Sequence, residues 1–309
     1  MANFDVSALP AYVEQNRDDL LNKLVFEGRT ISRMRKQTGI KTKAAINYLD
    51  TAPVFQDGST CGFSAQGAVT LTQREISTGV IKVNMDICPK TLLGTYAEYL
   101  VRMSALEEDK RMPFEEDVMR NVVNKIKKGM EKAVWQGDTA SEDAGLKHFD
   151  GLLKIAQNDA GVVDAAISAI TTPESAYNAI QQMYLAIPEP ALDNNARIFV
   201  SPAVFRLFSV AMVQKNYFHY SGAQDEDVRE FVFPGTNVRV ISTEGLAGTN
   251  YMLASTEENM YYGTDREGDE EDIRLWFSDD DDIWKLKVQW NAGVQFAFPD
   301  HVVLGTIAA

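Results

Sequence analysis

The fold of this chain is decided by WKLKVQWNAGVQFAF, residues 284–298. Every even-numbered position from Trp284 to Phe298 is apolar, while the odd-numbered positions are mostly polar, and Pro299 ends the pattern. A period of two residues is the signature of a β-strand with one buried face. Ordinary strands run about five or six residues. The sequence therefore predicts an unusually long strand that needs an equally long partner to cover its apolar face.

A long helix over residues 113–136 is the predicted partner of this strand. Pro113 suits a first helical position, acidic residues follow it in the first turn, and lysines gather toward the other end. Apolar residues recur every four positions from Val118 to Ile126, and Gly137 is a plausible stop. At 1.5 Å per residue such a helix is roughly 36 Å long.

A long β-hairpin is predicted within residues 46–90. Apolar and polar residues alternate over 68–72 and again over 81–88, on either side of a turn signal at 76–79. Isolated hairpins are marginally stable in water. We therefore expect its apolar face to be covered, either by the body of this chain or by a neighbouring molecule.

A compact α/β lobe is predicted over residues 150–250. Helices are expected to begin after Thr172 and Ser201, each followed by proline, and strands are expected at 197–200 and 238–241.

The two ends of the chain differ in charge. Residues 1–45 form a loosely helical arm up to Gly28, and the stretch 23–43 carries seven basic residues against Glu27 alone. The stretch 257–282 carries twelve acids against two arginines. The arm is either solvated and extended or docked on an acidic surface, such as that of another copy. The acidic stretch is either a solvated edge that blocks aggregation, a patch for a neighbour's arm, or a surface that is kept off DNA.

Size and charge limit the classes of function. The chain has 309 residues, 45% of them hydrophobic, which suffices for a sizeable core without disulfides or metals. Its net charge is −14, so phosphate repels it and nucleic-acid binding is not the default function. No apolar run reaches the 18 or so residues of a membrane span, and the first residues do not resemble a secretory signal. No membrane association is expected.

No catalytic, cofactor-binding or metal site is predicted. Cys61 and Cys88 are too few for a disulfide framework, and the three histidines stand far apart, which disfavours zinc. Cys61 with His148 or His219 could form a nucleophile–base pair, but no neighbouring residues support that pairing. The acids 279–282 lack the spacing of a calcium loop and favour a hairpin tip. Neither a phosphate-binding loop nor a nucleophile elbow is present.

Several stretches, in their order along the chain, resemble the major capsid proteins of tailed double-stranded DNA bacteriophages, which have the Hong Kong 97-type fold. These stretches are Ile87–Leu93, Met130–Asp138, Phe149–Leu153, Arg197–Pro202, Phe233–Val240 and Phe296–Gly305. The first two are similar to the exit of the family's hairpin and to its spine helix, and the third follows the Gly-Asp at the end of that helix, as it tends to in those proteins. The fourth and fifth are similar to a strand with the helix start after it and to the next strand of the axial lobe, and the last to the family's C-terminal strands.

The resemblance implies an α+β fold with a spine helix, long strands and an axial α/β domain. The expected parts are an N-terminal arm at 1–45, an extended hairpin (E-loop) at 46–90, a peripheral domain at 91–150 and 251–300, and an axial domain at 151–250 to which 301–309 return. Residues 73–79 at the expected hairpin turn include no lysine, so the lysine–asparagine cross-linking of the type member is not expected. No long scaffolding-like segment precedes the arm, which implies a separate scaffold or none.

The function implied by the resemblance is structural and not enzymatic. The chain would assemble into hexamers and pentamers of an icosahedral or prolate capsid around double-stranded DNA, without sequence-specific binding. It would lie in the virion, and in the host cytoplasm before assembly. Its partners would be further copies of itself, with scaffolding, portal and decoration proteins as additional candidates. The alternatives are an encapsulin-type shell that stores cargo and, from a different class, an acidic cytosolic α/β hydrolase.

Contacts between subunits are expected from the hairpin and from the arm. The hairpin residues are Val69, Leu71, Arg74, Glu75, Thr78, Gly79 and Lys82. The arm residues are Arg29, Arg33, Arg35 and Lys36.

Overall fold

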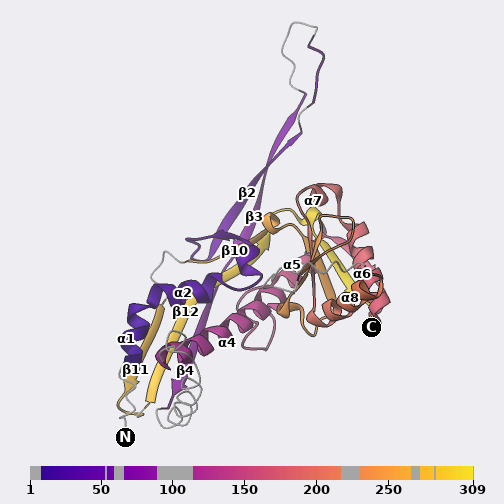
Figure 1. Ribbon diagram of the computed structural model, residues 1–309. Helices are drawn as coiled ribbons and strands as arrows, with labels where there is room; N and C mark the ends of the chain where they lie inside the picture. The colour runs from indigo at the N-terminus through magenta and orange to yellow at the C-terminus, as the bar shows by residue number, and fades with distance from the viewer. Residues whose placement is uncertain are drawn as a thin grey trace.

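A computed structural model describes residues 8–52, 54–58, 66–88, 114–216, 230–265, 272–281 and 283–308. Within these residues the chain forms a five-stranded sheet, a six-stranded sheet and a two-stranded ribbon that projects from the body (Figure 1). The long helix α4 (Phe114–Gln136) runs beside the five-stranded sheet toward the six-stranded one (Figure 1).

The predicted long strand is confirmed as β12, which is the centre of the five-stranded sheet. It covers Ile283–Phe296, and it has three antiparallel partners. Two of them pair with its first two thirds, from opposite edges, and the third pairs with residues 293–296. These partners are β11 (Asp272–Ser278), β4 (Gly79–Ile87) and β10 (Met260–Gly263). The strand β1 (Arg35–Gln37) pairs in parallel with β10. β12 is long because it must pair with three strands.

The even-numbered side chains of β12 form the apolar core that the pattern predicted. Trp284, Leu286, Val288 and Trp290 are buried in one cluster with the apolar residues of α4, whereas the odd-numbered side chains from 283 to 289 stay partly exposed. From Asn291 both faces are covered. The helix prediction is also confirmed, since α4 has 23 residues.

The N-terminal segment packs on its own subunit. It contains α1 (Ala8–Gln15), α2 (Arg17–Phe26), a short 3₁₀ turn at Ile31–Arg33 and β1. Its buried apolar residues belong to the core of β12 and α4: Val13, Leu20, Val25, Ile31 and Met34. The expectation of a solvated, extended arm is therefore wrong for these residues, because their apolar stripe finds cover within the subunit.

The predicted hairpin, in which the strand around 68–72 pairs with the strand around 81–88, is wrong in its pairing. The ribbon is formed by β2 (Lys43–Ala52) and β3 (Ala68–Ser77), which pair over ten residues, while β4 leaves β3 and joins the main sheet. Residues 76–79 are a bend at the base of the ribbon, where Thr78 N–H donates to the Thr42 carbonyl at 2.8 Å. A Cβ atom on Gly79 would lie 1.9 Å from the carbonyl oxygen of His148. The sharp bend therefore packs against backbone that leaves no room for a side chain.

The second sheet forms the α/β lobe. Its strands, in spatial order, are β5 (Val163–Ile167), β13 (Val303–Ile307), β9 (Tyr251–Ser255), β6 (Arg197–Val200), β8 (Arg239–Ser242) and β7 (Glu230–Val232). Its helices are α5 (Leu152–Asn158), α6 (Pro173–Ala186), α7 (Glu189–Asp193) and α8 (Pro202–Gln214). Because β9 lies in this sheet, the chain crosses to the other sheet after Ser255 rather than at residue 250.

Local sequence signals fix the helix starts in this lobe. Thr172 and Ser175 form a reciprocal capping box at the start of α6, and the Ser201 side chain accepts from Val204 N–H at the start of α8. Both caps lie where the sequence predicted them.

Candidate functional site

The projecting ribbon of β2 and β3 is the first candidate surface. Ile46 and Ile76 are buried at its base, and beyond them the described side chains of β3 at 68, 69 and 71–73 are exposed on both faces of the ribbon. Val69 and Leu71 are 68% and 64% exposed, and Phe55 beyond the end of β2 is 99% exposed. A bare two-stranded ribbon with exposed apolar side chains is a marginal structure in water. The ribbon therefore presents a surface suited to covering by another molecule.

Arg74 anchors this ribbon to the body. Its guanidinium pairs with Asp159 at 2.6 Å and donates to Gln295 Oε1 at 3.2 Å. Burial opposes ionisation of Asp159, but hydrogen bonds from the Gly161 N–H and from Arg74 outweigh it and hold the pKa of this carboxyl below its ordinary value. The direction in which the ribbon leaves the body is fixed by a charged contact.

The other hairpin residues that were expected at subunit contacts lie at the base of the ribbon or in the main sheet. Glu75 forms an exposed ion pair with Lys43, and the Thr78 hydroxyl lies 3.3 Å from the Thr42 carbonyl oxygen. Gly79 and Lys82 lie in β4, within the main sheet. Of the seven residues, only Val69 and Leu71 are on the projecting part of the ribbon, whereas the others position its base or belong to the body.

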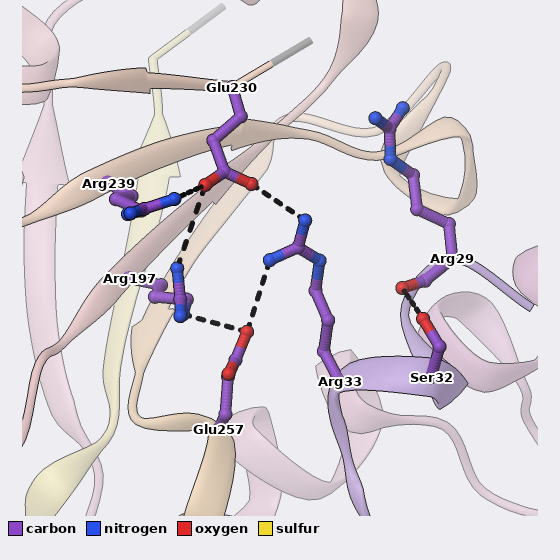
Figure 2. Close-up of polar contacts among 7 residues, drawn as sticks. All are labelled: Arg29, Ser32, Arg33, Arg197, Glu230, Arg239 and Glu257. Atoms are coloured by element: carbon purple, nitrogen blue, oxygen red, sulfur yellow. Dashed lines mark hydrogen bonds and ion pairs between the residues drawn. The ribbon is translucent and has the colours of Figure 1, made fainter. Parts of the chain in front are cut away.

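A network of five charged residues joins the N-terminal segment to the α/β lobe (Figure 2). Arg33 contacts Glu230 at 2.7 Å and Glu257 at 3.2 Å. Arg197 contacts Glu257 at 2.8 Å, and Arg239 pairs with Glu230. Burial opposes the charge of Glu230, but the arginines outweigh it and lower the pKa of this carboxyl. These residues come from the arm, from β6, β7 and β8, and from the turn after β9.

In this network a basic residue of the arm contacts an acid of its own subunit. Glu257 belongs to the acid-rich stretch 257–282, so arm and stretch do attract each other, but Arg33 makes that contact within one subunit. Arg35 and Lys36 lie over the rings of Tyr261 and Phe26 of the same chain. Docking of the arm on a second copy stays a prediction.

Arg29, the remaining arm residue, is oriented differently. Figure 2 shows its guanidinium apart from the five residues of the network, and its carbonyl oxygen accepts a hydrogen bond of 3.0 Å from Ser32 Oγ.

A buried polar cluster, which sequence reasoning missed, lies beside this network. Glu131 of α4 is almost fully buried and accepts hydrogen bonds from the N–H of Thr30, at 3.1 Å, and from its hydroxyl. Trp135 Nε1 donates to the same hydroxyl oxygen at 2.8 Å. Burial raises the pKa of Glu131 above its ordinary value, although these hydrogen bonds work against the rise. The sequence gives little signal for it, because Glu131 stands beside Lys132, as an exposed acid of a helix would.

Nothing in the described residues indicates catalysis. They contain no group of three or more histidine, cysteine or acidic side chains placed to hold a metal ion. Cys88 is half-buried, while Cys61 and His219 lie outside the described residues. Among the helices that the structure describes, none is long and apolar enough to cross a membrane.

Known proteins resemble this chain in structure and not in sequence. No known protein-family profile matches the sequence, and no curated protein matches it either. The satellite phage P4 procapsid, solved with its size determination (Sid) protein, matches with a TM-score of 0.60 at 12% identity, covering 99% of this chain and 94% of that one.

Two further solved structures match over almost the same extent. The capsid of an empty GTA particle matches with a TM-score of 0.56 at 12% identity, covering 91% of this chain and 90% of that one. A virus-like particle from Pyrococcus furiosus matches with a TM-score of 0.51 at 13% identity, covering 95% and 98%. At such low identity the likeness establishes the fold, and this chain has the α+β fold of phage capsid subunits.

Proposed function

We propose that this chain is a non-enzymatic shell subunit that assembles, as hexamers and pentamers, into a viral capsid around double-stranded DNA. The observation that carries the proposal is the ribbon of β2 and β3, which leaves a body with the phage capsid fold and has both faces uncovered beyond its base. In a closed shell each such ribbon would lie on a neighbouring subunit. The virion would then be the site of function.

The acidity of the chain supports this role. A net charge of −14 gives a surface that repels phosphate, and a wall that does not grip packaged DNA leaves the DNA free to enter and leave. DNA is thus enclosed rather than recognised.

A cargo-storing shell of the encapsulin type is the second candidate. The observation in its favour is the match to the Pyrococcus furiosus virus-like particle, which covers 98% of that chain. The match to the P4 procapsid has the higher TM-score, which favours the viral role. Particles that contain double-stranded DNA after infection support the viral role, and particles that contain only protein cargo support the alternative.

Truncation of the ribbon tests the proposal. Residues 49–71 are replaced by Asn-Gly, a dipeptide that suits a tight turn between paired strands and retains the contacts of Tyr48 and Arg74 with the body. We expect wild-type circular dichroism and melting temperature, but no particles in negative-stain electron microscopy.

A milder variant, V69S/L71S, removes only exposed apolar surface and should weaken assembly without abolishing folding. Particles of normal size from the truncated chain, or a wild-type chain that stays monomeric under all assembly conditions, would contradict the proposal.

A further inference from the structure

A groove on the body of the subunit has no occupant within the described chain. It lies between β4 and α4 and is closed at one end by the loop 143–148, with a volume of about 340 Å³. Its lining is largely apolar: Ile81, Val83, Ile126, Met130, Leu146 and Trp290. Apolar concavities of this size are suited to holding one or two large side chains.

Gly129 makes a notch in the wall of this groove. It lies inside α4, where glycine costs about 0.5–1 kcal/mol relative to alanine. A Cβ atom at this position would meet nothing within 4 Å. No contact with the described residues therefore requires a glycine here, and the missing side chain leaves the groove wider at this point.

The rim of the groove is basic. Lys82 and Lys132 line it, together with His148, and the one acid among its lining residues, Asp143, lies 3.9 Å from Lys132. An apolar side chain that arrives with carboxylates beside it would be favoured electrostatically.

The distal part of the ribbon has this chemistry. Phe55 is 99% exposed and Val54 is half exposed, so the chain supplies a large apolar side chain without cover. Between residues 46 and 73 the only charged residues are Asp50 and Asp57. The ribbon is thus apolar and acidic, whereas the groove is apolar and basic.

The ribbon cannot fill the groove of its own subunit. Over the seven residues from Ile46 to Ala52, β2 at about 3.3 Å per residue extends about 20 Å. The strands β2 and β3 extend away from α4 and β4 (Figure 1), so the end of β2 lies far from the two elements that form the groove of its own subunit. If the ribbon is the occupant, it therefore comes from a second copy of this chain.

We propose that Phe55 of one subunit inserts into the groove between α4 and β4 of a neighbouring subunit, with Gly129 providing the space and Lys82 and Lys132 facing the acids of the ribbon. This inference rests on the proposed shell function, because it names the place on the neighbour where the ribbon ends. A buried Phe side chain would contribute a large part of each ribbon contact.

Disulfide trapping tests this placement. In a C61S/C88S background, F55C and G129C are combined and particles are assembled under mild oxidation. We expect non-reducing gels to show multimers of the 34.4 kDa subunit that reducing agent removes. The matched control combines F55C with L185C, since Leu185 on α6 is also well exposed but lies outside the groove, and it should give monomer.

Substitutions in the groove provide an independent test. F55D should raise the protein concentration needed for assembly by about tenfold or more, because a charge replaces the buried ring. G129W should block the groove to a similar extent, while G129A should assemble like wild type.

The two proposals fail separately in these experiments. If wild-type protein forms no particles, the shell function itself fails. If wild-type particles form, but F55D and G129W assemble normally and F55C/G129C gives no multimers, the placement of Phe55 is wrong and the shell function stands.

Discussion

Trp135 and Thr30 are joined by a hydrogen bond of 2.8 Å across 105 residues of sequence, from the indole N–H to the threonine hydroxyl. The Trp135 ring also lies 5.2 Å from the ring of Phe199 in β6, and a Cβ atom on Gly245 would come within 2.2 Å of it. One side chain of the long helix thus contacts both the N-terminal segment and the α/β lobe. This contact and the charged network around Arg33 together hold these three parts in their relative positions.

Removing the hydroxyl of Thr30 should destabilise the subunit. T30V leaves the Trp135 N–H and one oxygen of Glu131 buried without their partner, and such a loss typically costs about 1–3 kcal/mol. Ser32 is the control, since its hydroxyl bonds to a carbonyl at an exposed site and S32A should cost less than about 0.5 kcal/mol. Urea unfolding of the isolated subunit measures both. Equal losses would contradict the assigned role of the buried cluster.

Glu131 should make stability fall as pH rises. Its folded-state pKa is raised above the unfolded value of 4.5, so the folded subunit holds the proton more tightly. The stability that this group contributes is therefore greatest below pH 4.5 and is lost as pH rises through the folded pKa. E131Q cannot titrate, and its free energy of unfolding relative to wild type should increase with pH across this window. A flat or falling difference would show that the pKa of Glu131 is not raised.

Glu230 should have the opposite pH dependence. Its folded pKa is lowered below 4.5, so its contribution is present above pH 4.5 and is lost as pH falls through the folded pKa. E230Q should destabilise the subunit at pH 7 and have less effect toward pH 3. Hydrogen exchange of residues 31–37 is the second readout, because Arg33 contacts Glu230. A matched control is E75Q, whose partner Lys43 is exposed, and which should change neither quantity appreciably.

The two faces of β12 should differ in their sensitivity to truncation. Trp290 is 1% exposed, and W290A should cost about 3–5 kcal/mol. The neighbouring Gln289 is partly exposed, and Q289A should cost less than about 1 kcal/mol. Thermal or urea unfolding compares the two. Similar losses would refute the assignment of the buried face.

Substitution of alanine for glycine should change the stability of the subunit in opposite directions at two positions. In G79A the new Cβ would meet the His148 carbonyl oxygen at 1.9 Å, so the backbone must shift and the subunit should lose stability. In G129A the new Cβ would meet nothing, and the gain in helix propensity should stabilise by about 0.5–1 kcal/mol. Urea midpoints of the two variants measure this contrast. A destabilised G129A would show that the notch is required within the subunit.

The sequence alone determined the elements whose signals are local. The period of two from Trp284 to Phe298, the apolar stripe of the helix that ends before Gly137, and the caps at Thr172 and Ser201 all depend on residues close in the chain. Local backbone geometry and burial of one face are enough to specify such elements, and the structure has them where they were predicted.

Only the tertiary structure decided which elements and side chains meet. The alternation in β3 suits pairing with β2 or β4 equally well. In the structure β3 pairs with β2, because Ile76 and Ile46 are buried together at the base of the ribbon and because β4 is already paired with β12. Arg33 could have met acids on any copy, yet the packing of its own arm holds it beside Glu257. These choices depend on contacts between residues far apart in the chain, whose energies no local pattern records.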